Sequence, residues 1–390
     1  MKKPTRVNHP PEVELPPGNR ALVAPIYQSV KFEFETLADT ERFFRGEQPG
    51  FFYSRASNPT TRQLELLLAE LQGRADCLVT ATGVAAISQT LLALTKQGDH
   101  VLCFVETYNP TRYLIRRLLG RFGVTHTMLS IEDLPGIERV LASTPTRLVL
   151  FESPTNPVTK IADIAAITRL AHAAGALTVM DNTFAGFHQH GAYEIDLFVH
   201  SLTKYASGAG DVMGGAVIGR TELIRSLRAD FGALGAALDP HAAFLVLRGL
   251  KTYFVRYQAQ SASAARIAAY LEAHPAVARV HYPGLTSHPQ HALAAAQMQD
   301  FGTIVTFDLK GGAAAARHLA DRLELFALAA SLGSTDSLVV TAQMMTAREL
   351  TADEQRISAV TEGTVRLSIG LEDIDDLLAD LASALEVARD

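Results

Sequence analysis

Short apolar runs alternate with segments of helical period in the central part of the chain, and this alternation restricts the fold more than any other feature. Four runs are nearly continuous in apolar residues: 100–105, 147–151, 177–180 and 197–199. Such runs are typical of strands buried on both faces of a parallel sheet. Helical period is present at 60–73, 85–95 and 112–122. The alternation predicts an α/β domain around a mostly parallel sheet.

The C-terminal third has a different texture. Residues 303–309 (TIVTFDL) and 364–369 (TVRLSI) alternate apolar and polar side chains, which predicts strands with one face in solvent. A long helical period precedes them at 240–271, and further helices are predicted at 313–323 and 371–388. The last of these begins among acidic residues, which suit a helix N-terminus. These elements predict a smaller α+β domain.

We therefore expect three parts: an N-terminal arm over 1–55, a larger α/β domain over 56–250 and a smaller α+β domain over 251–390. The arm is rich in proline and turn residues and has no apolar core of its own. Because a long arm of this kind needs a surface to pack on, we expect it to contact a neighbouring subunit.

The composition disfavours nucleic-acid-binding, membrane and disulfide-rich secreted proteins. Lys plus Arg number 35 and Asp plus Glu 41, which gives a formal charge of −6, so we expect neither a nucleic-acid nor a membrane partner. Two cysteines, Cys77 and Cys103, cannot form a disulfide framework, and HPPEVELPP stands where the apolar part of a signal peptide would be. No apolar stretch is long enough to span a membrane. We expect a cytoplasmic protein.

Polar side chains follow the predicted strands where ligands bind in open α/β sheets, at their carboxyl ends. Asp181 follows the run 177–180, and Lys204 follows the run 197–199 together with Ser201 and Thr203. Upstream, the pair Thr82-Gly83 opens a helix, whose free N–H groups can bind an anion. The predicted edge of the sheet thus combines an amine, a carboxylate, hydroxyls and an anion site.

This set suits pyridoxal phosphate. The aldehyde of that cofactor needs a lysine, here Lys204, and its ring nitrogen needs a carboxylate partner, here Asp181. Tyr108, which follows the run 100–105, is placed to stack on the ring. The residues predicted to hold the phosphate are Thr82, Gly83, Val84, Ser201 and Thr203.

At these residues the sequence resembles the Cys/Met-metabolism family of pyridoxal-phosphate enzymes, which includes cystathionine γ-synthases, cystathionine lyases and methionine γ-lyases. The similar stretches, in family order, are YSR at 53–55 with NPT at 58–60, ESPTNP at 152–157, DNT at 181–183, HSLTKY at 200–205, DVMGG at 211–215, SLG at 331–333 and VRLSIGLE at 365–372. They span residues 50 to 375 and are specific for the family and the cofactor rather than for the substrate.

The resemblance implies a fold type I pyridoxal-phosphate transferase that assembles as a homotetramer of two catalytic dimers with shared active sites. It implies that Tyr53 and Arg55 reach the neighbouring subunit's site and hold its cofactor phosphate, and that Tyr53 also contacts the substrate. It further implies that Asn156 helps to hold the cofactor ring, and that Arg366 and Ser331 bind the substrate α-carboxylate. The pattern of residues 364–369 alone favours an outward-facing Arg366.

The activity implied is γ-elimination or γ-replacement on a γ-substituted amino acid of the homoserine or sulfur type. Lys204 then moves the α-proton, Asp181 keeps the ring nitrogen protonated, and Tyr108 exchanges protons with the amine or the leaving group.

Three departures from the family patterns bear on the substrate. Pro110 stands where methionine γ-lyases have a cysteine, and Ala330 stands where cystathionine γ-synthases and γ-lyases commonly have a glutamate. The segment 340–345 (VTAQMM) replaces a usual His-Pro element. We expect a reshaped distal pocket.

Other functions stay open at this point. The same scaffold supports a β-eliminating C–S lyase or a γ-lyase for a leaving group without sulfur. A catalytically inactive relative is disfavoured because Lys204 and Asp181 are both present. A metal-binding protein would use histidines, for which the candidates are His188, His190, His288 and His291. No cysteine or acidic cluster completes a ligand set, so we expect no metal.

Overall fold

A seven-stranded sheet organises the larger part of the computed structural model, which describes residues 16–345 and 350–386. Its strands are β1 (Asp76–Thr80), β2 (His100–Phe104), β3 (Thr125–Leu129), β4 (Leu148–Glu152), β5 (Leu177–Asp181), β6 (Leu197–Ser201) and β7 (Gly215–Gly219). They lie in the order β1-β7-β6-β5-β4-β2-β3. Only β7 runs antiparallel to its neighbours, so the predicted mostly parallel sheet is confirmed.

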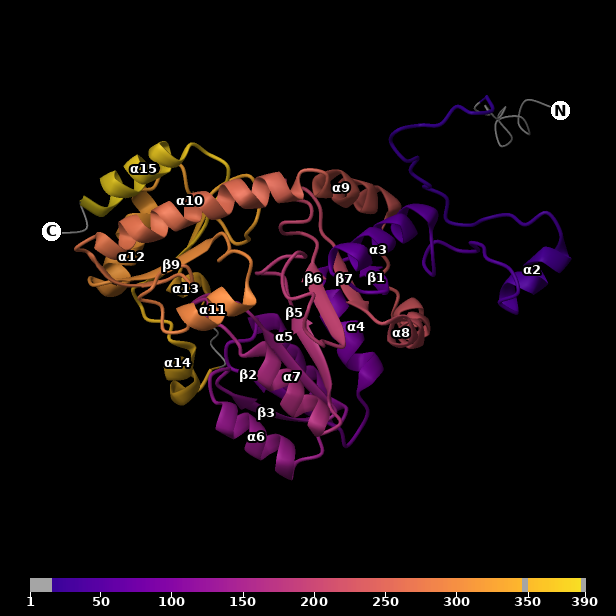
Figure 1. The fold of residues 1–390 in the computed structure, drawn as a ribbon, viewed down its shortest axis with the longest axis horizontal. Helices are drawn as coiled ribbons and strands as arrows, with labels where there is room; N and C mark the ends of the chain where they lie inside the picture. The colour runs from indigo at the N-terminus through magenta and orange to yellow at the C-terminus, as the bar shows by residue number, and fades with distance from the viewer. Residues whose placement is uncertain (1–15, 346–349, 387–390) are drawn as a thin grey trace.

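Helices cover both faces of this sheet (Figure 1). Alternate residues along each strand enter different cores: in β4, Val149 and Phe151 pack in one, Leu148 and Leu150 in the other. The helices on the first face are α3 (Pro59–Leu71), α6 (Leu134–Ser143), α7 (Ile164–Ala173) and α9 (Pro240–Leu250). Those on the second face are α4 (Gly83–Leu94), the π-helix η1 (Leu114–Leu119) and α8 (Thr221–Leu234). The short helix α5 (Asn109–Tyr113) contacts α4 and leads into η1. The predicted α/β architecture is therefore present.

A second, five-stranded sheet in the order β10-β11-β12-β9-β8 forms the C-terminal part. Its strands are β8 (Val277–His281), β9 (Ile304–Leu309), β10 (Ala327–Leu328), β11 (Leu338–Thr341) and β12 (Thr364–Ser368). The accompanying helices are α10 (Tyr253–Ala273), α11 (His291–Gln297), α12 (Gly312–Arg322), α13 (Ala342–Met345), α14 (Ala352–Ser358) and α15 (Ile374–Glu386). Residues from α10, α12 and α15 pack on one face of this sheet in a common core.

The prediction that β9 and β12 each expose one face to solvent is wrong. Every residue of both strands is buried. The polar face packs against the larger part of the chain: Thr306 donates a hydrogen bond to the carbonyl oxygen of Pro157 at 2.6 Å, and Arg366 donates to Asn156. In these two strands, the alternation of polar and apolar side chains therefore indicates a polar face buried against another part of the chain and not a face in solvent.

Three predicted helices are also corrected. The single period over 240–271 is two helices, α9 and α10, which are interrupted at 251–252. Just before this interruption, the Gly249 Cα lies so close to the carbonyl oxygen of Ser207 that a Cβ would be 2.2 Å from it. The helix over 112–122 is split between α5 and η1 and ends at Leu119. The last helix starts at Ile374 because Glu372 accepts hydrogen bonds from Ser337 instead. Its predicted end, 387–388, lies outside the described residues.

The N-terminal arm extends away from both sheets in Figure 1. Residues 1–15 of it lie outside the described part. The remainder contains a helix that the sequence reading missed, α2 (Leu37–Phe44), which has no buried residue. Leu22, Leu37 and Phe44 are 96%, 75% and 65% exposed, so the arm has large apolar side chains without a core. Among the described helices, none combines the length and apolarity needed to cross a membrane.

We expect Phe151→Ala to lower the free energy of unfolding by about 3–5 kcal/mol, because this side chain is fully buried at the centre of the larger sheet. Phe122→Ala is the matched control, since Phe122 is 61% exposed and its loss should cost little. Urea unfolding followed by circular dichroism compares the two variants. Equal losses would contradict the assigned core.

Candidate active site

Three neighbouring strands bring an amine and two carboxyl groups to one edge of the larger sheet. Glu152 ends β4 and pairs in register with Asp181, which ends β5. Lys204 follows the end of the next strand, β6. Because all three strands are parallel, their carboxyl ends meet at the same edge, as the sequence predicts.

Lys204 is a desolvated amine. Its Nζ donates a hydrogen bond to the Oγ of Ser331 at 2.8 Å, which joins the larger sheet to the C-terminal part. Burial, and then the positive charge of Arg366, lower the pKa of Lys204 to about 8. A neutral amine is therefore available near neutral pH, where an ordinary surface lysine stays charged.

Arg366 is a buried cation held by neutral oxygens. Its Nη1 donates to the Oδ1 of Asn156 at 2.8 Å, and its Nη2 donates to the carbonyl oxygen of Ser331 at 2.9 Å. Its Nε is buried and has no partner among the described residues. Burial lowers the pKa of Arg366 to about 10. A guanidinium in this state can bind a carboxylate from a ligand, and the pattern-based alternative of an outward side chain is wrong.

Ser331 links the two cations. It binds the Lys204 amine through its hydroxyl and the Arg366 guanidinium through its carbonyl oxygen. Its backbone has a φ of 149°, a conformation that residues with a side chain rarely adopt. The strained serine fixes the spacing of the amine and the guanidinium.

A buried hydrogen-bond network backs the Asp181 strand end. Asn182 donates to Gln72, which also binds the ring of His200 at 2.7 Å, and Asn182 accepts from the ring of His190. Burial lowers the pKa of both histidines to about 3, so both are neutral donors. The sequence considered alone suggested only a metal-ligand role for His190 and none for Gln72, Asn182 or His200, because the network joins segments up to 128 residues apart.

The start of α4 has the form of an anion site. The hydroxyl of Thr82 caps the helix by accepting from the backbone N of Ala85, which leaves the first amides, at Gly83 and Val84, without an intrahelical partner. Gly83 packs against Ser201 so closely that a Cβ would lie 2.8 Å from the Ser201 Cβ. Only glycine brings the helix start this near to the hydroxyl of Ser201.

Thr203 is partly engaged within the chain. Its Oγ1 accepts from the backbone N of Gly214 at 3.2 Å, which leaves its hydroxyl hydrogen for a ligand or for the distant Gly214 oxygen at 3.5 Å. The donor set near Lys204 is thus one that pyridoxal phosphate fits: amides and hydroxyls for a phosphate, Asp181 for a ring nitrogen, and a neutral amine for an aldehyde.

Tyr108 and Glu152 meet at the same edge. The backbone N of Tyr108 donates to the Oε1 of Glu152 at 2.5 Å. Tyr108 is 41% exposed, which leaves its ring free to stack on a ligand, and its pKa is raised by burial and by the neighbouring acids Glu152 and Asp181. Glu152 is a residue whose role the sequence analysis missed, although it belongs to the quoted ESPTNP stretch.

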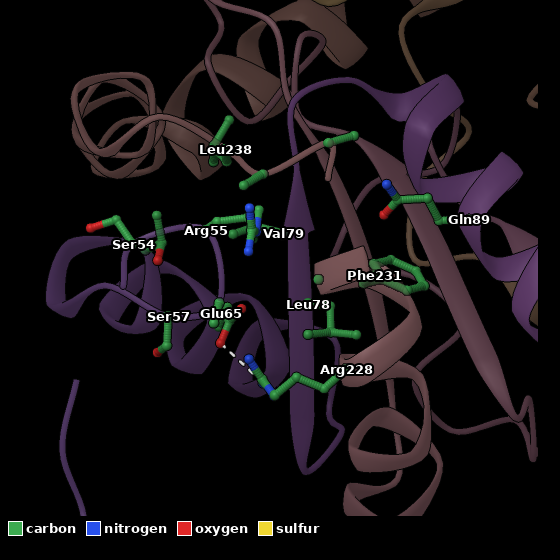
Figure 2. A pocket seen from close by; sticks show the side chains of 15 residues that line it. Ser54, Arg55, Ser57, Glu65, Leu78, Val79, Gln89, Arg228, Phe231 and Leu238 are labelled. Atoms are coloured by element: carbon green, nitrogen blue, oxygen red, sulfur yellow. Dashed lines mark hydrogen bonds and ion pairs between the residues drawn. The ribbon is translucent and has the colours of Figure 1, made fainter. Parts of the chain in front are cut away.

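Tyr53 and Arg55 lie elsewhere on the chain. Arg55 lines a pocket beside Val79, with Glu65 and Arg228 paired below it (Figure 2). Lys204, Asp181 and Arg366 do not line this pocket. Both arm residues are exposed, with the Arg55 guanidinium 5.4 Å from the centre of the Tyr53 ring. Within one chain Arg55 therefore lines a pocket to which Lys204 does not contribute.

The histidine candidates have other contacts. His188 binds the hydroxyl of Tyr253 and the carboxylate of Asp300, and His291 binds the carbonyl oxygen of Pro283. In residues 16–345 and 350–386, no three His, Cys, Asp or Glu side chains are grouped as a metal site would need.

The fold and this set of donors define a fold type I pyridoxal-phosphate enzyme. The chain belongs to the Cys/Met metabolism PLP-dependent enzyme family, whose model matches residues 9–386. It is an enzyme of the lyase and transferase type that carries out γ-elimination or γ-replacement with pyridoxal phosphate. This assignment confirms the predicted family, fold class and cofactor.

Relatives in this family differ in activity. The chain is 42% identical to an L-methionine gamma-lyase of Pseudomonas putida over 94% of this chain and 93% of that one. It is 37% identical to an O-succinylhomoserine sulfhydrylase of Pseudomonas aeruginosa over 92% and 90% of the two chains. A crystal structure of cystathionine gamma synthase from Xanthomonas oryzae pv. oryzae superposes with a TM-score of 0.89 at 37% identity, covering 94% of each chain.

We expect the rate at which pyridoxal phosphate combines with the cofactor-stripped protein to rise with pH through a midpoint near 8, because only the neutral Lys204 amine attacks an aldehyde. Arg366→Gln removes a positive charge facing this amine, so its pKa rises and the midpoint moves to higher pH. Stopped-flow absorbance measures both, with Arg266→Gln, a surface ion-pair residue, as the control. A wild-type midpoint at the ordinary lysine value of 10.5 would contradict the assignment.

Proposed function

We propose that the edge formed by Lys204, Asp181 and Arg366 is the active site, and that it acts at Cγ of an α-amino acid. The observation that carries this proposal is a pair of desolvated basic groups: the Lys204 amine, whose pKa is lowered to about 8, and the buried Arg366 guanidinium with an unpartnered Nε. One group suits proton transfer, and the other suits an α-carboxylate.

Each remaining residue has a proposed task toward the cofactor. Pyridoxal phosphate, when bound, supplies an aldehyde that combines with amines and a protonated ring that withdraws electrons from the substrate. Asp181 holds the proton of the ring nitrogen, Asn156 orients the ring and Arg366, and Tyr108 covers the ring face. The residues proposed to hold the phosphate are Thr82, Gly83, Val84, Ser201 and Thr203.

The proposed reaction depends on proton movements by the chain itself. Lys204 takes the proton from the substrate Cα and, because its pKa is lowered, is able to accept and return protons in the same pH range. Tyr108, whose pKa is raised, keeps its phenol proton available for the amine or the leaving group. Ser331 holds the Lys204 amine until substrate enters.

The distal part of the site favours a γ-substituent without a charge. Ala330 and its neighbour Ala329 are both exposed and offer no carboxylate to a distal amino group. We therefore propose substrates of the methionine or O-acetylhomoserine type over cystathionine. Pro110 provides no thiol near Tyr108, which distinguishes the site from the family pattern of methionine γ-lyases.

Product analysis tests this function. With methionine or O-acetylhomoserine, we expect 2-oxobutanoate, or a γ-replaced product when a thiol is added, and slower turnover of cystathionine. Lys204→Ala should lower kcat by at least about a thousandfold because it removes the proton-transfer group. Pyruvate as the main product would instead indicate a β-eliminating lyase, and full turnover by Lys204→Ala would refute the site.

We further propose a homotetramer of two catalytic dimers in which the 1–55 arm, with Tyr53 and Arg55, completes the site of the neighbouring subunit. The larger domain then covers 56–250 and the smaller one 251–390. Support comes from the exposed apolar side chains of the arm and from the separation of Arg55 from Lys204 within one chain. The exposed side chains of such an arm can pack against a second copy of the chain.

Subunit mixing tests the shared site. Lys204→Ala and Arg55→Ala should each be impaired alone, because each removes one part of every site. After unfolding and refolding together in equal amounts, random pairing should restore about a quarter of the sites, since each hybrid dimer contains one site with both residues intact. The readout is activity before and after mixing. No recovery, with hybrids confirmed by mass spectrometry, would show that both residues serve the same subunit.

A further inference from the structure

Glu152 is a buried carboxyl group beside the proposed ring partner. It is 5% exposed and stands at the end of β4, in register with Asp181 at the end of β5. Neighbouring strands lie about 4.8 Å apart, so these two acids occupy adjacent positions at the site edge. The mechanism proposed above uses Asp181 but gives Glu152 no task.

The surroundings of Glu152 provide little support for a negative charge. Its Oε1 accepts one hydrogen bond, from the backbone N of Tyr108, and it forms no ion pair with any residue of the described chain. The charged and titratable groups that face it are Asp181 on β5 and, on the segment after β2, Tyr108, Glu106 and Arg112. Two of these are acids, and one is a cation.

The single cation is engaged elsewhere. The Nη1 of Arg112 donates to the carbonyl oxygens of Val105 and Thr107 and so ties the backbone of the Tyr108 segment, while the positive charge of Arg112 partly opposes the rise in the pKa of Glu152. Glu106, by contrast, is neutralised by an ion pair with Lys160 at 2.9 Å. Among the described residues, no ion pair comparable to Lys160–Glu106 is formed by Glu152 or by Asp181.

Two adjacent buried carboxyl groups share one proton, because the second ionisation places like charges side by side. Burial raises the pKa of Asp181, and the hydrogen bonds that Asp181 accepts from the backbone N and the hydroxyl of Thr183 oppose this rise and favour its ionised form. Burial and the charge of Asp181 raise the pKa of Glu152 well above its usual range. The hydrogen bonds thus place the charge on Asp181 and the proton on Glu152.

We propose that Glu152 is a positioning residue: as a neutral carboxylic acid it fixes the backbone of Tyr108 at the site edge and leaves the negative charge of the carboxyl pair on Asp181. The inference rests on the proposed function in one respect, the pairing of Asp181 with the cofactor ring. It assigns different tasks to the two acids, which are one strand apart and of the same chemistry.

Amide substitutions separate the two tasks. Glu152→Gln keeps a neutral acceptor for the Tyr108 N–H, so the dissociation constant of pyridoxal phosphate should stay within about threefold of wild type. Glu152→Ala leaves that buried N–H without an acceptor, and the constant should rise by about tenfold or more. Asp181→Asn, the matched substitution on the next strand, should raise it most, because it removes the charge. Absorbance titration of the stripped protein measures all three.

Two spectroscopic readouts report on the charge rather than on folding. The pH at which the visible band of the bound cofactor titrates should be nearly unchanged in Glu152→Gln, whereas loss of a nearby negative charge shifts such a midpoint by about a unit or more. In infrared difference spectra at neutral pH, Glu152→Gln should remove the band of a protonated carboxyl group. Loss of a carboxylate band instead, or a shifted midpoint, would overturn the proposal.

The proposal also fails if Glu152→Gln weakens cofactor binding as much as Glu152→Ala does. Because Glu152→Gln is isosteric, it keeps the test decisive if the alanine variant does not fold. A wild-type protein without a visible band in the presence of pyridoxal phosphate would refute the proposed function itself, and the infrared band of the unliganded protein would still decide the protonation of Glu152.

Discussion

The desolvation of two neighbouring basic groups, Lys204 and Arg366, is the constraint on which the proposed active site depends. Removing an unpaired charge from water costs several kcal/mol, and no carboxylate in the described chain forms an ion pair with either residue. The amine responds with a lowered pKa, and the guanidinium is held by the neutral oxygens of Asn156 and Ser331. Each of the two groups is stabilised most by a ligand group that the chain itself does not provide: an aldehyde for the Lys204 amine and a carboxylate for the Arg366 guanidinium.

The scaffold provides the rigidity that this arrangement requires. The parallel register of β4, β5 and β6 fixes three strand ends, and the neutral network around Gln72 supports two of them from behind. The C-terminal sheet adds the second half of the site, because its polar face is buried against the larger part of the chain. The site therefore lies on the contact between two sheets, and the strained Ser331 joins them.

The sequence predicted the parts of the site that follow from local rules. Lys204 and Asp181 directly follow buried parallel strands, and such strand ends meet at one edge whatever the details of packing. These local rules could not predict that Arg366 is buried. The strand β12 alternates apolar and polar side chains like a strand with one face in solvent, and only contacts with residues far away in the chain bury its polar face. The family resemblance, not the pattern, pointed to that residue. The network at Gln72 carries no local signal at all.

Within one chain, the N-terminal arm buries too little surface to offset the conformational entropy that is lost when it is ordered. Tyr53 and Phe44 are 41% and 65% exposed, and α2 buries none of its residues. Ordering this segment within one chain therefore gains little free energy from the burial of apolar surface. The arm is tied to the larger part of the chain by a few polar contacts: Asn58, which caps α3, donates to the backbone oxygen of Tyr27, and Gln28 donates to Asp239. A segment that is held by a few hydrogen bonds, exposes large apolar side chains and carries Arg55 near its base has the properties expected of a contribution to a neighbouring subunit.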